Sequence, residues 1–276
     1  MNNKSIYYMI FSVIAFAIMN AIVKYLSTFH VYQIVFFRSI GTLAFTIPLI
    51  IKYKIPVLGT HKKLLLLRGF LGVFSLVFFF QSLKYLSVGT AVSLRYTSPI
   101  FAAIFAIIFL KENIKPIQWL LFLIAFIGVL IIKGFGNDIN YLGLIYVLFS
   151  AISLGLVLVI IRKIGKREHP LVIINYFMVM AFFFGGFMSI YNWKNPNLNQ
   201  LLLLSSLGIF GYIGQLYMTK AFQTNETNLL APLKYLEIVF TIIIGVFWFQ
   251  EIYNLYTVLG IILILVGLIY NLFLKK

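Results

Sequence analysis

Long apolar runs of about 20 residues dominate this sequence, and they constrain its fold more than any other feature. A helix rises 1.5 Å per residue, so about 20 apolar residues cross the hydrocarbon core of a bilayer. The runs are apolar on all sides, which excludes amphipathic surface helices, and they lack the alternation of barrel strands. They predict ten membrane-spanning helices, at roughly 5–24, 31–51, 65–84, 88–110, 115–132, 140–161, 170–191, 199–220, 227–249 and 253–273.

The composition excludes a soluble protein. Hydrophobic residues make up 62% of the 276 residues and charged residues 10%, with a mean hydropathy of +1.04. A soluble domain has about 25% charged residues. The net charge of +16 does not indicate nucleic-acid binding, because the Lys and Arg residues lie in short clusters between the apolar runs. The predicted partners are therefore the lipid bilayer and a small-molecule substrate, with no nucleic acid.

Residues that commonly hold metals or carry out catalysis are scarce. Cysteine is absent, and the three histidines are far apart and lack HExxH spacing. No GxxxxGK[ST] phosphate loop occurs. We therefore expect no metal site, no cofactor and no catalytic residue. The first run follows Lys4 and has no small-residue cleavage site after it, which favours a retained helix over a signal peptide.

Lysine and arginine residues are distributed unevenly between the two sides of the predicted spans. With the N-terminus placed in the cytoplasm, the inside segments and adjoining span ends hold fifteen of them, Arg68 included, and the outside segments hold four. Cytoplasmic loops carry an excess of Lys and Arg, so this bias predicts that both termini are cytoplasmic. The remaining three basic residues, Arg38, Arg95 and Lys234, lie within predicted spans.

The two halves of the chain, residues 1–139 and 140–276, match each other when the sequence is shifted by 139 residues. The match needs no gap, and it pairs Gly69 with Gly208, Gly72 with Gly211, Arg95 with Lys234, Tyr96 with Tyr235, Phe101 with Phe240, Glu112 with Glu251 and Gly128 with Gly267. Each half holds five spans, and this odd number turns the second half upside down relative to the first. Many secondary transporters are built from such repeats. We therefore predict an all-α membrane protein with ten transmembrane helices as two inverted five-helix repeats.

The sequence resembles the EamA family of the drug/metabolite transporter superfamily over essentially its whole length. The resemblance rests on the two five-span halves and on three segments: LRYTSPIFAAIFAIIFLKE at Leu94–Glu112, its counterpart at Leu233–Glu251, and FFRS at residues 36–39. It implies a transporter in a bacterial-type inner membrane, in a family that carries amino acids, nucleosides, cofactors and drugs. The halves differ at the proline that is expected to kink the fourth span, because Ile238 occupies the position equivalent to Pro99.

Arg95 and Lys234 are the substrate-binding candidates that the sequence indicates most clearly. Each lies about seven or eight residues into a predicted span, where a charge costs about 3 kcal/mol even on the lenient insertion scale. Such a residue faces a wet cavity, a partner or a solute. Arg95 has no acid in its own span, whereas Glu237 lies three residues after Lys234 on the same helical face. For Lys234, substrate contact and an ion pair both stay open.

Glu237 is the acid that lies deepest in a predicted span. Burial favours the protonated form of a carboxyl group, so Glu237 is the candidate for proton coupling, with a fixed ion pair to Lys234 as the alternative. The coupling ion, a proton or sodium, stays open. Arg38 lies about two turns from the outer end of the second span. It either attracts anions into an outward vestibule or fixes helix packing by binding carbonyls.

Further candidates are polar groups and small residues within or near the spans. Hydrogen-bonding side chains lie at Asn20, Gln81, Tyr96, Gln215 and Tyr235. Small residues recur at every third position in the third and eighth spans, at Gly69, Gly72, Ser75, Gly208, Gly211 and Gly214. This spacing leaves a groove on one helix face, which serves close helix packing or makes room for a ligand.

Together these features predict a secondary active transporter that moves a small polar or amphipathic organic metabolite with an anionic group by alternating access. The resemblance implies amino acids and their derivatives, including S-adenosylmethionine-like compounds, as the solutes to test first. The alternative is a membrane-embedded enzyme acting on a lipid or isoprenoid, but the six acids are scattered and offer it no paired carboxylates. A purely scaffolding membrane protein would not need Arg95.

Overall fold

The computed structural model describes residues 3–111, 115–135, 140–224 and 236–273, and all its regular secondary structure in these ranges is helical. The helices are α1 (Asn3–Tyr25), α2 (Val31–Lys52), α3 (Lys62–Ser82), α4 (Val88–Arg95), α5 (Ser98–Leu110), α6 (Pro116–Phe135), α7 (Tyr141–Ile164), α8 (Pro170–Ser189), α9 (Leu198–Thr224), α11 (Leu236–Phe249) and α12 (Leu255–Phe273). Two short 3-10 helices, η1 (Gly165–Arg167) and η2 (Ile190–Asn192), follow α7 and α8. The predicted all-α class is confirmed.

The helices of the described ranges have the length and composition of membrane spans. Seven segments are long and apolar enough to cross a bilayer: α1, α2, α3, α4 with α5, α7, α8 and α9. The described parts of α6, α11 and α12 form shorter apolar helices. These segments coincide with the predicted spans to within a few residues, except that the predicted beginning of the ninth span lies outside the described residues.

Large apolar side chains cover the outer surfaces of these helices. Phe183 of α8 is 67% exposed, and Phe247 and Trp248 of α11 are 84% and 72% exposed. Apolar patches of this extent are rare on soluble monomers and mark contact with another apolar medium. Lipid is therefore the solvent that suits the outside of the bundle.

Side chains in the connecting loops determine where several helices begin. His30, Ser87, Asn140 and His169 are N-caps, and each accepts a hydrogen bond from a backbone N–H two or three residues further along. Such caps satisfy N–H groups that the first helical turn leaves without an intrahelical partner. Two of the three histidines thus have a local structural role.

The fourth predicted span is divided into two helices beside its proline. α4 ends at Arg95, and α5 begins at Ser98 with Pro99 in its first turn. Proline has no N–H to donate to the carbonyl of Arg95, four residues before it, and its ring clashes with that carbonyl, so the helix is interrupted here. The interruption places Arg95 in the last turn of α4, where its side chain reaches the interior of the bundle.

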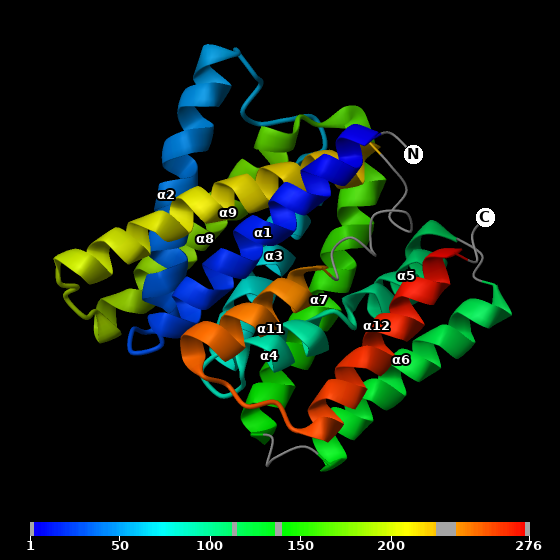
Figure 1. Ribbon diagram of the computed structural model, residues 1–276. Coiled ribbons are helices and arrows are strands. Elements are labelled where there is room, and N and C mark those ends of the chain that lie inside the picture. Colours follow the sequence, from blue (N-terminus) through cyan, green and yellow to red (C-terminus); the bar gives the residue numbers. More distant parts are fainter. Residues whose placement is uncertain (1–2, 112–114, 136–139, 225–235, 274–276) are drawn as a thin grey trace.

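Helices from the two halves of the chain pack against each other in pairs (Figure 1). α1 lies along α9, α3 along α7, and α2 on α8, while α6 and α12 lie side by side at one edge of the bundle. α2 and α9 also approach closely, because a Cβ built on Gly208 would lie 2.4 Å from the Cα of Gly41. A side chain larger than hydrogen does not fit at this crossing, so the glycines set the spacing of these two helices.

Candidate functional site

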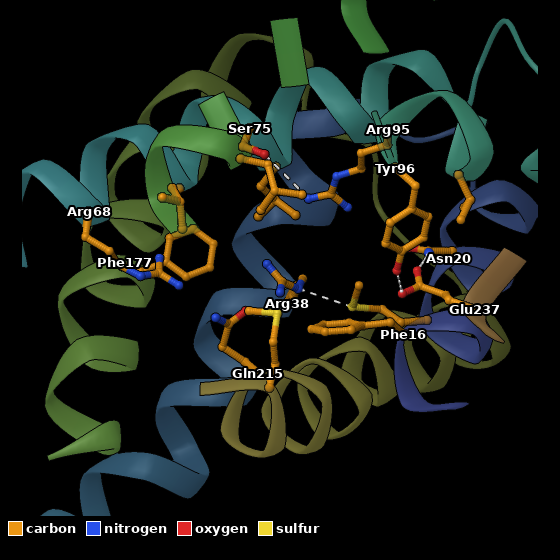
Figure 2. A pocket seen from close by; sticks show the side chains of 17 residues that line it. Phe16, Asn20, Arg38, Arg68, Ser75, Arg95, Tyr96, Phe177, Gln215 and Glu237 are labelled. Carbon is orange, nitrogen blue, oxygen red and sulfur yellow. Dashed lines mark hydrogen bonds between the residues drawn. The ribbon is translucent and has the colours of Figure 1, made fainter. Parts of the chain in front are cut away.

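A cavity of about 60 Å³ lies among the helices in the interior of the bundle (Figure 2). Its walls come from α1, α2, α3, α4, α7, α8, α9 and α11, together with the residue that follows α4, so both halves of the chain contribute. Its charged and polar lining residues are Asn20, Arg38, Arg68, Ser75, Arg95, Tyr96, Gln215 and Glu237. Aromatic and apolar side chains with a few convergent polar groups are the usual lining of a small-molecule site.

Arg95 extends from the end of α4 into this cavity. Its Nη2 donates to the Ser75 hydroxyl of α3 at 3.5 Å, which is a long hydrogen bond. Its guanidinium carbon lies 4.0 Å from the centre of the Phe79 ring, and its buried Nε has no hydrogen-bond partner. The ring stabilises the cation but accepts no conventional hydrogen bond. Arg95 therefore keeps donors available for a solute.

Arg38 of α2 is almost completely buried, with 2% of its surface exposed. Its Nε donates to the thioether sulfur of Met19 at 3.2 Å, and its Nη1 has no partner. Its guanidinium carbon lies 5.6 Å from the centre of the Phe177 ring and 5.9 Å from that of Phe80. A thioether is a weak acceptor, so the hydrogen-bonding capacity of Arg38 is largely unused in this structure.

Arg68 of α3 is a third cation of the cavity, which the sequence did not indicate. The charge count assigned it to the inside end of the third span, but its side chain is 1% exposed and lines the cavity. Correcting this assignment leaves fourteen basic residues against four, so the predicted bias keeps its direction. Nε and Nη1 of Arg68 are buried without partners, and its guanidinium carbon lies 4.4 Å from the centre of the Phe177 ring.

The groove of small residues is the sequence feature that could have revealed Arg68. A Cβ built on Gly72, one turn after Arg68, would lie 2.6 Å from its Nη1 and 2.9 Å from the Phe177 ring. A Cβ on Gly211 would similarly lie 3.1 Å from the Nε of Arg38. Gly69 instead packs beside Met180 of α8. Some members of the groove thus pack helices, and others make room for the cavity arginines.

Glu237, in the first turn of α11, supplies the carboxylate of the described lining, and 4% of its surface is exposed. The side-chain amide of Asn20 donates to its Oε1 at 2.8 Å, and the Tyr96 hydroxyl donates to its Oε2. Hydrogen bonds to a buried carboxylate offset part of the cost of removing it from water. These bonds join α1, the end of α4 and α11 beside the cavity (Figure 2).

The structure brings together most of the predicted binding and coupling residues. Those that line the cavity are Arg38, Arg95, Tyr96, Gln215 and Glu237. Nε2 of Gln215 is buried without a partner. Gln81 lies in the last turn of α3 and is not part of the described lining, and Lys234 and Tyr235 lie outside the described residues. Within the described ranges, no group of three or more His, Cys, Asp or Glu residues could hold a metal ion.

The formal charges of the described lining do not cancel. Three arginines and one glutamate leave an excess of two positive charges. In an apolar interior a cation is costly unless an opposite charge, an aromatic face or hydrogen-bond acceptors stabilise it. The aromatic rings of Phe79 and Phe177 provide part of this stabilisation, and the arrangement as a whole is complementary to an anion.

Two further carboxylates bind backbone N–H groups near the two ends of α3. Glu168, which follows η1, accepts from the N–H groups of Thr60 and His61 at 2.7 and 2.6 Å. Burial alone would raise the pKa of Glu168, but the hydrogen bonds from Thr60 and His61 outweigh it and hold the pKa below its ordinary value. Beyond the other end of α3, Glu251 accepts from the N–H of Val88, the first residue of α4, at 3.0 Å.

The apolar helices are those of an integral multi-pass membrane protein. The model of the EamA-like transporter family matches residues 3–134 and again residues 141–273. The chain therefore belongs to the EamA-like transporter family, as the sequence resemblance predicted. It is a membrane transporter and not an enzyme, because the family and the similar proteins below are transporters.

Several curated proteins are similar to this chain over most of its length. The pseudopaline exporter CntI of Pseudomonas aeruginosa (strain UCBPP-PA14) is 30% identical, over 92% of this chain and 90% of the exporter. The S-adenosylmethionine uptake transporter of Rickettsia prowazekii (strain Madrid E) is 27% identical, over 99% and 94%. Human solute carrier family 35 member G1 is 28% identical, over 92% and 75%. A solved crystal structure at 16% identity has the same fold, with a TM-score of 0.70 over 99% of this chain and 98% of that one.

Proposed function

We propose that the protein is a secondary active transporter that carries a small organic metabolite with an anionic group through the central cavity. The observation that carries this proposal is the presence of three arginines with unpaired buried donors around one cavity between helices of both halves. Such cations are expensive in a membrane interior and mark solute pathways. An anionic solute would provide hydrogen-bond acceptors and negative charge for these arginines.

Alternating access of two inverted repeats, residues 1–139 and 140–276, is the proposed mechanism of transport. Close contacts of equivalent residues support this relation. Gly69 approaches Met180 of α8, and its counterpart Gly208 approaches Gly41 of α2, the residue equivalent to Met180 in the 139-residue register. The contact between α3 and α8 thus recurs between the equivalent residues of α9 and α2, as a two-fold axis relating the halves would give.

The small volume of the cavity also supports a mechanism in which the two halves move. A volume of about 60 Å³ holds a few water molecules. Pockets that enclose organic ligands are typically about 300–1,000 Å³. In this proposal the structure represents a contracted state, and the cavity widens when the halves rotate to admit or release the solute.

Amino acids and their derivatives, including S-adenosylmethionine-like compounds, are the first solutes to test. Two of the similar proteins are named for the export of pseudopaline and the uptake of S-adenosylmethionine, which supports a metabolite of this kind. Glu237 is the proposed coupling residue, because its carboxylate lies beside the cavity and is bound by Tyr96 and Asn20. A proton would act on this carboxylate, and sodium is the alternative coupling ion.

Uptake into vesicles that contain the purified protein tests the proposed function. Arg95→Ala should abolish saturable uptake at normal membrane abundance, and Arg95→Lys should weaken it because the planar fork of donors is lost. Arg167→Ala is a matched control, since Arg167 is an exposed arginine of η1. If Arg95→Ala transports normally, or fails only because the protein does not accumulate, the central cavity is not the transport site.

We also propose that the protein lies in a bacterial-type inner membrane with both termini in the cytoplasm. The excess of basic residues on one side of the spans supports this orientation. Because the chain has no cysteine, single cysteines report their side without interference. Thr28→Cys, in the exposed loop after α1, should react with an impermeant reagent in intact cells, whereas Lys63→Cys should not. The opposite pattern would reverse the proposed orientation.

A further inference from the structure

We infer that the solute carries at least two acidic groups, which different arginines of the cavity bind separately. This inference rests on the proposed transport function and narrows its substrate class. It follows from three observations on the described residues: no carboxylate lies within ion-pair distance of the arginines, their guanidinium groups rest on two different rings, and the nearby carboxylate accepts hydrogen bonds from other residues.

The first observation is the absence of a carboxylate partner for the cavity arginines. Within the described ranges, none of Arg38, Arg68 and Arg95 has a carboxylate oxygen within 4.0 Å. Each also has at least one buried nitrogen without a hydrogen-bond partner. A guanidinium group has five N–H donors and no acceptor, so an acidic group is the partner that best uses such unpaired nitrogens.

The second observation is that the guanidinium groups rest on two different aromatic rings. The guanidinium groups come from three helices, and Figure 2 shows them reaching the cavity from different directions. Arg95 rests on the ring of Phe79, at 4.0 Å from its centre, while Arg38 and Arg68 lie 5.6 and 4.4 Å from the centre of Phe177. The cations thus rest on two different rings, with Arg95 on Phe79 and Arg38 and Arg68 on Phe177, and two cationic places suit acidic groups spaced along a carbon skeleton better than one compact anion.

The third observation is the position of Glu237. Both of its carboxylate oxygens accept hydrogen bonds, one from Asn20 and the other from Tyr96. These two hydrogen bonds come from α1 and from the residue that follows α4. Counting the negative charge of Glu237 in full still leaves the described lining with an excess of two positive charges.

This excess discriminates between solutes of similar size. A monoacid engages one guanidinium group and leaves the others uncompensated, whereas a diacid or triacid engages several. A net cation such as S-adenosylmethionine adds to the positive charge, and juxtaposed like charges are strongly unfavourable in a desolvated site. We therefore expect a diacid to bind on the order of tenfold more tightly than its own half-ester.

The test measures thermal shifts and vesicle uptake of the full-length protein with five probes. These are succinate, monomethyl succinate, tricarballylate, glycerol 3-phosphate and S-adenosylmethionine. Succinate and monomethyl succinate differ by one charge at nearly constant shape, so succinate should act at about one-tenth of the concentration. Tricarballylate should bind at least as well as succinate. Glycerol 3-phosphate has its charges on one group and should bind more weakly, so tighter binding of it than of succinate would overturn separate recognition.

Substitutions at the two most buried arginines assign the acidic groups to their partners. Arg38→Gln and Arg68→Gln should each reduce the preference for succinate over its half-ester to about threefold or less. Arg68→Lys keeps the charge and should retain more of the preference, which separates lost charge from damaged folding. Arg167→Gln, in the exposed 3-10 helix η1, should leave the preference unchanged.

The outcomes for the inference and for the proposed function are distinguishable. If monomethyl succinate or S-adenosylmethionine shows saturable uptake and succinate does not, the inference is wrong while the transport function stands. The inference is also wrong if both glutamine variants keep the full preference. If none of the five probes and no amino acid shows saturable uptake that depends on Arg95, the proposed function and the inference fail together.

Discussion

The two segments matched by the family model contribute different chemistry to one cavity. The first segment, residues 3–134, supplies the three arginines, and the second, residues 141–273, supplies Glu237 and the ring of Phe177. The carboxylates that bind backbone N–H groups near the ends of α3, Glu168 and Glu251, also lie in the second segment. In the 139-residue register Arg95 and Glu251 have charged counterparts, Lys234 and Glu112. The other four, Arg38, Arg68, Glu168 and Glu237, have none, so only part of the charge pattern is repeated.

Arg38 and Phe177 show how this difference arises. They are 139 positions apart, which is the register of the internal match, and they contact each other in the cavity. Gly72 makes room beside Phe177, and its counterpart Gly211 makes room beside Arg38. The cation Arg38 of the first segment thus contacts the ring of Phe177, which occupies the equivalent position in the second segment. Both segments have a glycine, Gly72 or Gly211, at the position that makes room for these side chains.

Exchanging Arg38 and Phe177 is the strongest test of whether the two positions are equivalent. Phe177→Arg alone places a further cation against Arg38 and Arg68, and it should destabilise the fold by about 3 kcal/mol or more, as an uncompensated buried charge does. The double variant Arg38→Phe with Phe177→Arg restores the number of cations and should recover most of this loss. Thermal unfolding in detergent measures both changes. A double variant no more stable than Phe177→Arg would contradict the equivalence of the two positions.

The equivalent glycines Gly69 and Gly208 test how closely the two segments correspond in packing. An alanine Cβ at Gly208 would lie 2.4 Å from the backbone of Gly41, which cannot move aside, so Gly208→Ala should cost about 2–3 kcal/mol. At Gly69 the nearest atom is the sulfur of Met180 at 2.5 Å, and its flexible side chain can yield. Gly69→Ala should therefore cost less than about 1 kcal/mol. Equal losses in the free energy of unfolding would show that the two crossings are equally rigid.

The contact of Glu168 with the first segment should depend on pH. The pKa of this carboxyl lies below its ordinary value of 4.5 when the protein is folded. Its stabilising contribution is therefore present above that value and is lost as the pH falls through the folded pKa. Glu168→Gln should lower the free energy of unfolding by about 1–2 kcal/mol at pH 7. The difference between wild type and variant should shrink below about pH 4.5, and a difference that stays constant across this range would contradict the assignment.

The smallest predicted effect on transport concerns two glutamine residues, Gln81 and Gln215. Gln215 of the second segment lines the cavity with an unpaired Nε2, whereas Gln81 of the first lies at the end of α3 and away from the described lining. Gln215→Ala should reduce the apparent affinity for the solute by about threefold to tenfold, as loss of one hydrogen bond does. Gln81→Ala should leave transport unchanged. Transport kinetics in vesicles decide between them, and equal effects would remove Gln215 from the site.

The positions of the spans could be predicted closely because they depend on local properties. A run of apolar residues between charges fixes where a helix can cross a bilayer, whatever the rest of the chain does. The deep position of Arg95 and the proline after it were visible for the same reason. The sequence also indicated Arg38, Tyr96 and Glu237 as polar groups in apolar surroundings, and the cavity contains all three.

The sequence by itself determined the all-helical class, the approximate span boundaries and the polar residues that had to be accommodated inside the bundle. Only the tertiary structure decided which of these residues meet. Arg68 lies near a span end, so its burial depends on how α3 packs with α8, and the contact of Arg38 with Phe177 joins residues 139 positions apart. Hydropathy acts along the chain, whereas a binding site is made where separate helices cross, and those crossings follow from side-chain packing that no local pattern encodes.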